Sequence, residues 1–168
     1  ITIPISNSNS STTANNLDFK EAAEKTVNAV VHVKNTTNSK NLNSDKHFFF
    51  GDSEPRERIG SGSGVIISAD GYIVTNNHVI ENSSQLEVTL NNNKTYTAEL
   101  IGTDSNTDIA LIKINTNEDL AYVPFGDSDN LKIGEWVLAV GNPFNLTSTV
   151  TAGIVSGKAR DLNEFDGN

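Results

Sequence analysis

Residues 60–80, GSGSGVIISADGYIVTNNHVI, decide the fold. Two largely apolar runs, 64–68 and 72–76, flank the tripeptide Ala69-Asp70-Gly71. An Asp-Gly step between such runs is a strong signal for a tight hairpin turn, because glycine adopts the backbone angles that the turn requires. The stretch therefore predicts two antiparallel strands joined by a short turn.

Strand patterns continue on both sides of this hairpin. Leu86, Val88 and Leu90 alternate with polar residues, which is the period of a half-buried strand. Further strands are predicted over 30–33, 96–100, 109–114, 136–140 and 149–156, and the apolar run 109–114 predicts a strand covered on most sides. Seven or so short strands with no helices between them favour an all-β protein built on a closed barrel.

The N-terminal part of the chain is expected to be different. Residues 1–16 are mostly Ser, Asn and Thr, which bury little apolar surface, and are predicted to form a flexible leader. A helix is predicted from Asp18, with Glu21 three positions later as a capping-box signal. Residues 34–58 are predicted to form a long polar loop, and residues 161–168 the start of another loop.

Composition excludes several classes of function. The 21 acidic residues outnumber the 12 basic ones, and the net charge is −9. A nucleic-acid-binding protein needs clustered Lys and Arg to neutralise phosphates, so nucleic acid is not an expected partner. The sequence has no cysteine for a disulfide or a thiolate metal site. No apolar run approaches the roughly 20 residues of a membrane span. The chain starts at Ile1 without an initiator Met, so we expect a processed form or a fragment, and the absent signal peptide does not argue against export.

His78 is the first candidate catalytic residue. It directly follows the predicted strand 72–76, so its ring can project from a rigid strand end toward solvent. An imidazole with an ordinary pKa of about 6.5 can accept and return a proton near neutral pH. The alternative is a surface histidine without a role.

Asp108 is the second candidate, at the entrance to the predicted strand 109–114. A carboxylate next to so apolar a strand is costly to bury unless it is paired, and an imidazole N–H is a natural partner. The alternative is an aspartate that hydrogen-bonds its own turn, the role expected of Asp104. A metal site built from His32, His47 and His78 is disfavoured, because their spacing matches no common ligand pattern. No cofactor or metal is expected.

Four segments together resemble the HtrA/Deg family of trypsin-like serine proteases. Residues 62–67 and 71–79 resemble the histidine segment of that family, 101–114 the aspartate segment, 134–144 the entry to the second barrel, and 149–156 the strand that follows. The resemblance extends from about Asp18 to Arg160. It implies an all-β, trypsin-like two-barrel fold with a short N-terminal helix, in which the first barrel is complete and the second only begun. The expected organisation is a leader over 1–16, helix and first barrel over 17–135, and the start of the second barrel over 136–168.

By this resemblance His78 is the general base and Asp108 its orienting partner. The family carries its nucleophile in a Gly-Asn-Ser-Gly-Gly motif, which occurs nowhere in the 168 residues. Ser61 and Ser63 precede the histidine, and Ser156 matches a structural position, so none of these serines is expected to be the nucleophile. These residues alone are therefore expected to be inactive.

Other expectations also rest on the resemblance. Residues 34–58 match a loop that reaches toward another subunit in relatives, where Phe48, Phe49 and Phe50 would act as a plug; the alternative is a loop whose aromatic residues cluster locally. Arg160 matches a position in the activation-sensing loop, and the alternative is a solvated charge at a strand end. The helix and leader resemble the part of the family that forms a trimer or higher oligomer.

The function implied is that of an ATP-independent serine endoprotease in protein quality control. Its expected partners are unfolded or misfolded polypeptides, and its expected location is an exported compartment, the bacterial periplasm or cell envelope. The alternative is a non-catalytic, protease-like chaperone or scaffold module. Relatives usually carry C-terminal PDZ domains, and none is found in these 168 residues.

Overall fold

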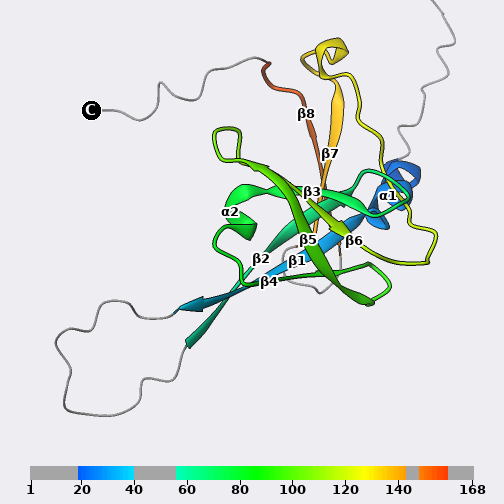
Figure 1. Cartoon of the computed structure of the whole chain (residues 1–168). Helices are drawn as coiled ribbons and strands as arrows, with labels where there is room; N and C mark the ends of the chain where they lie inside the picture. The colour runs from blue at the N-terminus through cyan, green and yellow to red at the C-terminus, as the bar shows by residue number, and fades with distance from the viewer. Residues whose placement is uncertain (1–18, 40–55, 143–147, 159–168) are drawn as a thin grey trace, which may run out of the picture.

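A computed structural model describes residues 19–39, 56–142 and 148–158. Six strands close into a barrel in the order β1-β2-β3-β6-β5-β4, and every neighbouring pair is antiparallel (Figure 1). The strands are β1 (Val30–Ser39), β2 (Arg56–Ile66), β3 (Tyr72–Asn76), β4 (Gln85–Thr89), β5 (Thr95–Asp104) and β6 (Ile109–Ile114). The prediction of a closed β-barrel is confirmed.

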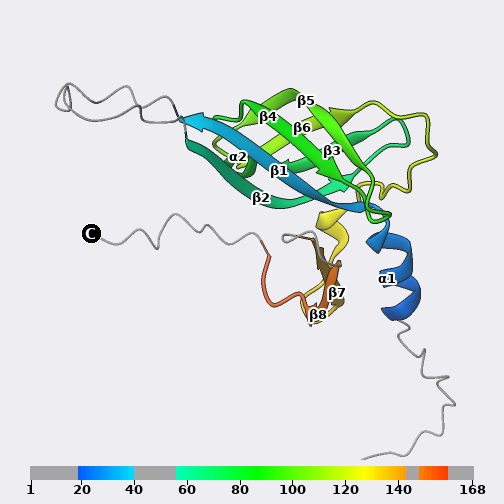
Figure 2. The same ribbon diagram turned by 90° about the horizontal axis from the view of Figure 1, so that it is seen from below.

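Two further strands form a separate antiparallel sheet. β7 (Trp136–Gly141) pairs with β8 (Thr149–Ile154) along its whole length. This sheet lies on one side of the barrel next to helix α1 (Phe19–Val27), as Figure 2 shows. The rings of Phe19 and Trp136 meet edge to face, with centroids 5.2 Å apart. One complete barrel and one begun sheet agree with the predicted fold class, while the predicted domain limits stay predictions.

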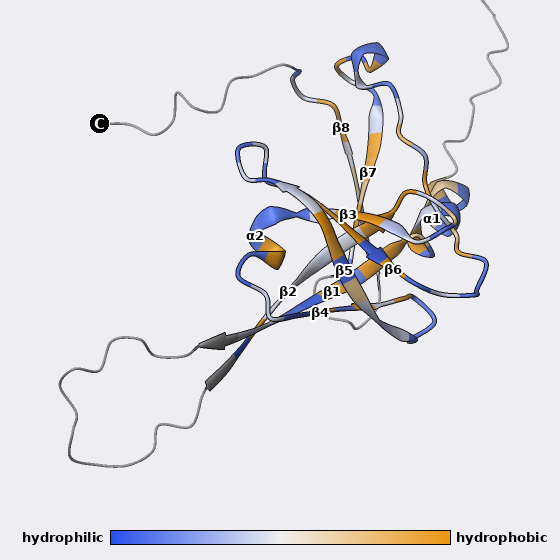
Figure 3. Cartoon of the chain, viewed as in Figure 1, coloured by the Kyte–Doolittle hydropathy of each residue, from blue (hydrophilic) through white to orange (hydrophobic). Residues whose placement is uncertain are grey.

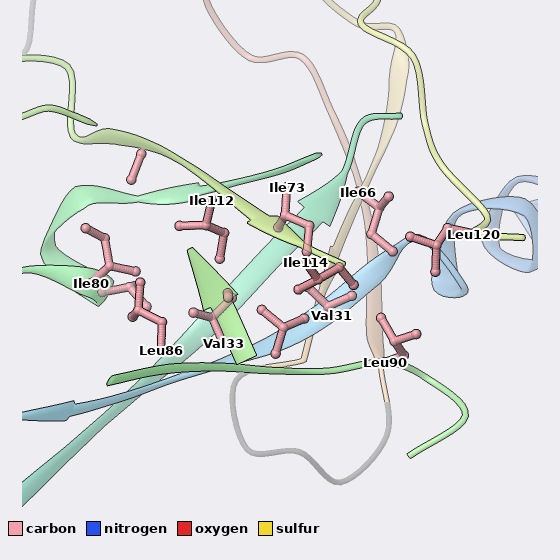
Figure 4. Close-up of a cluster of buried hydrophobic side chains, with 14 residues drawn as sticks. Val31, Val33, Ile66, Ile73, Ile80, Leu86, Leu90, Ile112, Ile114 and Leu120 are labelled. Atoms are coloured by element: carbon pink, nitrogen blue, oxygen red, sulfur yellow. The ribbon is translucent and has the colours of Figure 1, made fainter. Parts of the chain in front are cut away.

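Alternating side chains fill the barrel. In β6, Ala110, Ile112 and Ile114 are buried, whereas Ile109 is 49% exposed. The sequence predicted a strand covered on most sides, and β6 fits this except at Ile109, because the outward residues Leu111 and Lys113 are half-buried. Figure 4 shows the resulting core, and Figure 3 shows hydrophobic residues along the barrel strands and hydrophilic residues in the turns. The largest fully buried side chains are Val31, Val33, Ile66, Ile73, Val88, Ile112 and Ile114. Each such side chain stabilises the fold by about 1.5–3 kcal/mol.

The predicted hairpin between β2 and β3 is present. The N–H of Ile67 donates to the carbonyl of Tyr72 at 2.9 Å, and that of Gly71 donates to Ser68 at 3.1 Å. Gly71 has a φ of +95°, which only glycine adopts without strain. The Asp-Gly step therefore forms the turn that pairs β3 antiparallel to β2.

The predicted loop over 34–58 is wrong at both of its ends. β1 continues to Ser39 and β2 begins at Arg56, and these polar segments pair as a two-stranded ribbon that extends from the barrel in Figure 1. The ribbon is held by its backbone ladder, which needs no apolar side chains and so leaves no hydrophobic alternation in the sequence. Residues 40–55, including the predicted plug of Phe48, Phe49 and Phe50, lie outside the described residues.

The described helices are short. α1 has nine residues and α2 (Asn77–Ile80) has four. No helix among the described residues has the length and apolar character needed to cross a membrane.

Candidate active site

His78 lies on α2, the single helical turn that directly follows β3. Its neighbours Val79 and Ile80 are buried and anchor the turn to the barrel. The His78 side chain is itself 69% exposed. The sequence placed this histidine at a strand end, and the structure adds the helical turn that points it away from the core.

Asp108 lies immediately before β6 and faces His78. β3 and β6 are neighbours, with Asn76 opposite Ile109, so the residue after one strand lies near the residue before the other. Nδ1 of His78 and Oδ2 of Asp108 are 2.7 Å apart. The backbone N–H of His78 donates to Oδ1 of the same carboxylate at 2.9 Å. The predicted contact between the two side chains is therefore present.

The electrostatics of the pair decide which nitrogen carries the hydrogen. The backbone N–H of His78, followed by its ring, lowers the pKa of Asp108, so the carboxyl is ionised near neutral pH. A carboxylate only accepts hydrogen bonds, so Nδ1 of His78 must donate. In the neutral ring Nε2 then has a free lone pair and can accept a proton. The sequence argument attributed the pairing of Asp108 to the cost of burying its carboxylate. The Asp108 side chain is 43% exposed, so burial is not the reason for the pairing.

The backbone of Asp108 is also held. Its φ is +55°, in the left-handed region that few residues other than glycine adopt. Its carbonyl accepts hydrogen bonds from the N–H of Asn77 at 3.1 Å and from Nδ2 of Asn76 at 3.2 Å. Nδ2 of Asn76 also lies 3.1 Å from Oδ2. Sequence reasoning missed Asn76, because its contact with Asp108 depends on the pairing of β3 with β6.

This arrangement can be compared with known proteins. A family model described as trypsin-like peptidase domain matches residues 62–168, more than half of the chain, and the match includes His78 and Asp108. The chain belongs to the trypsin-like peptidase family.

Two relatives of this chain are bacterial proteins. A protein of Marinomonas sp. (strain MWYL1), named probable periplasmic serine endoprotease DegP-like, is 47% identical over 169 residues, which cover 86% of this chain and 36% of the relative. A Bartonella henselae protein with the same name is 53% identical over 104 residues, which cover 62% of this chain and 21% of the relative. The chain thus spans about a third or less of these curated relatives.

Solved structures agree with the sequence relatives. The structure titled "HtrA-type protease AlgW with tripeptide" matches this trypsin-like peptidase with a TM-score of 0.71 and 32% identity, covering 88% of this chain and 42% of that one. The HtrA/Deg resemblance inferred from the motifs is confirmed, and the chain corresponds to part of such proteins.

Three other residues singled out in the sequence and described by the structure, His32, Ser63 and Asp104, have partners outside the His78–Asp108 pair. Oγ of Ser63 accepts a hydrogen bond from the N–H of Asn142 at 2.8 Å and so links the barrel to the second sheet. His32 is buried in β1, and its Nδ1 lies 3.0 Å from the carbonyl oxygen of Asn142. Asp104 bonds its own turn through Asn106 and Thr107, as expected. Arg160 lies outside the described residues.

Proposed function

We propose that this chain supplies the general base and its orienting residue to a serine endopeptidase. His78 is the base and Asp108 orients it. The observation that carries the proposal is the two-point contact, in which one carboxylate accepts both the backbone N–H and the ring Nδ1 of His78. Such a contact fixes the position and the tautomer of the ring together.

The proposed chemistry follows from this geometry. Nε2 of His78 takes the proton of a serine hydroxyl as its oxygen attacks the carbonyl carbon of the substrate. The same proton then passes to the departing amine when the C–N bond breaks. Asp108 stabilises the imidazolium that exists between these two transfers, and it remains ionised throughout.

The attacking serine is not expected among these residues. The Gly-Asn-Ser-Gly-Gly motif is absent from the 168 residues, and the hydroxyl of Ser63 is engaged by Asn142. Loss of the triad serine reduces turnover on the order of a millionfold. The 168-residue chain alone should therefore not hydrolyse peptide bonds.

The proposed substrates and location are those implied by the resemblance to the HtrA/Deg family. We infer unfolded or misfolded polypeptides as substrates, export to the bacterial periplasm or cell envelope, and a homotrimer or higher oligomer as the assembly. The relatives named periplasmic serine endoproteases support the location and the class of reaction.

The test compares the 168-residue chain with the complete protein that the gene encodes, called the encoded protein below. Both are incubated with a fluorophosphonate probe and with a fluorescein-labelled unfolded polypeptide. We expect labelling and degradation by the encoded protein, loss of degradation in its His78→Ala variant, and neither reaction in the 168-residue chain. Stoichiometric labelling of the 168-residue chain, or full activity of His78→Ala, would overturn the proposal. An inert encoded protein would instead favour a non-catalytic scaffold.

A further inference from the structure

Asn76 has a position that predicts one role and contacts that show another. It is the last residue of β3 and the N-cap of α2, with φ −84° and ψ 144°. An asparagine at an N-cap normally uses its side-chain oxygen to accept an N–H from the first turn of its own helix. Asn76 makes no such hydrogen bond.

Asp108 takes over the capping of α2. Its carbonyl accepts the N–H of Asn77 at 3.1 Å, and its Oδ1 accepts the N–H of His78 at 2.9 Å. The first two N–H groups of the helical turn are therefore satisfied from the neighbouring strand. Because the turn is capped in this way, the side chain of Asn76 is free for another contact.

That contact is with Asp108 itself. Nδ2 of Asn76 lies 3.2 Å from the main-chain oxygen of Asp108 and 3.1 Å from its Oδ2. One amide group thus binds the backbone and the side chain of the same residue. This links the direction of the carboxylate to a main chain that is itself in the left-handed region.

We propose that Asn76 is a positioning residue, whose amide holds the Asp108 carboxylate in the orientation that binds the backbone and the ring of His78 at once. Oδ2 accepts from both Asn76 and Nδ1 of His78. Without the amide, the partly exposed carboxylate can turn toward water, and the ring then loses its fixed partner. The importance of this for catalysis rests on the proposed function, whereas the contact itself does not.

The electrostatic consequence agrees with this geometry. The His78 backbone N–H and ring lower the pKa of Asp108 most, and the Asn76 amide lowers it further. Removing the Asn76 amide should therefore raise the pKa of Asp108, although both donors of His78, its backbone N–H and its ring Nδ1, are kept. This gives a readout that a purely structural residue would not change.

The first test uses the 168-residue chain and NMR. Asn76→Ala is compared with Asn91→Ala, a matched control that removes another exposed amide hydrogen bond, from Asn91 to Asn28. We expect the carboxyl carbon of Asp108 to titrate at higher pH in Asn76→Ala and the Nδ1 proton of His78 to exchange faster with water. Asn91→Ala should leave both signals unchanged.

A second variant guards against misfolding. Asn76→Asp keeps the shape of the side chain and an equally good N-cap residue, but places an acceptor against Oδ2. It should raise the pKa of the Asp108 carboxyl more than Asn76→Ala does, because two carboxylates at this distance disfavour joint ionisation. If neither variant changes the Asp108 titration or the His78 Nδ1 proton, the inference is wrong.

Activity gives an independent second test in the encoded protein. Loss of one hydrogen bond to a charged group predicts about a tenfold lower kcat for Asn76→Ala, with little change in KM. An unchanged kcat would reject the positioning role. An encoded protein without any peptidase activity would reject the proposed function only, because the NMR titration still decides the contact between Asn76 and Asp108.

Discussion

The ring Nδ1 of His32, in the barrel, donates a hydrogen bond to the carbonyl oxygen of Asn142, 110 residues later at the end of β7. Asn142 is also tied to the barrel through its N–H, which donates to Oγ of Ser63. Both residues of the first contact are buried, with 7% and 4% exposure. The main chain of Asn142 is thus bound on both its polar atoms, and this residue joins the second sheet to the barrel.

Replacing His32 tests this joint. His32→Phe removes the donor and leaves the Asn142 carbonyl buried without it, so we expect a loss of about 1–3 kcal/mol in the free energy of unfolding. Amide exchange in β7 and β8 should rise more than in the barrel. His32→Asn keeps an N–H near the position of Nδ1 and should lose less stability. A larger loss of stability in His32→Asn than in His32→Phe would show that ring volume, not the hydrogen bond, is what matters.

Gly62 packs against Val79 in α2, the helical turn that carries His78. A Cβ at this position would lie 2.6 Å from Cγ2 and 2.9 Å from Cγ1 of Val79, which is closer than side chains pack. Gly62→Ala should therefore destabilise the chain by about 1–3 kcal/mol. It should also shift the NMR signals of His78, because Val79 is the next residue.

A double variant identifies the cause of that loss. Val79→Ala alone leaves a cavity and should cost about 2 kcal/mol. Combining it with Gly62→Ala fills part of the cavity, so the double variant should be more stable than the sum of the single effects predicts. Urea unfolding of the four proteins measures this coupling, and strict additivity would contradict a direct contact.

Asp108→Asn should reverse the tautomer of His78. The His78 backbone N–H requires an acceptor at the position of Oδ1, so the new amide nitrogen faces Nδ1 of the ring. Nδ1 must then accept and Nε2 carries the hydrogen, which removes the proton acceptor. We expect the 15N shift of Nδ1 to become that of a nitrogen without a hydrogen and the shift of Nε2 to become that of a protonated nitrogen. Activity of the encoded protein should fall about 10⁴-fold. Unchanged ring shifts would contradict this arrangement.

Asp108 also makes stability depend on pH in the acid range. Its pKa in the folded chain lies below the ordinary value of 3.8, so the folded state binds this proton less readily than the unfolded state. The stabilisation is complete above the ordinary value and is lost as the pH falls through the lower folded pKa. The urea midpoint of Asp108→Asn should therefore fall less on acidification than that of the parent. Because Asp70 and Asp104 also have lowered pKa values and remain in both proteins, the difference between the two curves is the measure.

Much of the fold could be predicted because its strands bury one face. The alternation of Leu86 and Val88 and the Asp70-Gly71 turn mark elements that the structure contains. The polar ribbon of β1 and β2 could not be predicted, since it is stabilised by backbone pairing and shows no apolar period. The exposure of Ile109 at the start of β6 was missed because this outward residue is also apolar.

The site shows the same division. His78 and Asp108 were found because their local sequences are distinctive and resemble a known family. Asn76 was not found, because its partner is set by the β3–β6 register, which no local pattern reveals. From the sequence alone, an asparagine at the end of a strand is interpreted as a turn residue. Its contact with Asp108 becomes evident only when the pairing of β3 with β6 is known.

The cross-strand capping of α2 has a consequence for how the molecule folds. A four-residue helical turn is not stable alone, and its first two N–H groups, of Asn77 and His78, donate to Asp108, which lies 31 and 30 positions later. His78 can therefore reach its orientation only after β6 has docked on β3. A nascent chain that ends before Asp108 should carry an imidazole without orientation, so ring alignment and barrel closure should occur in one cooperative step.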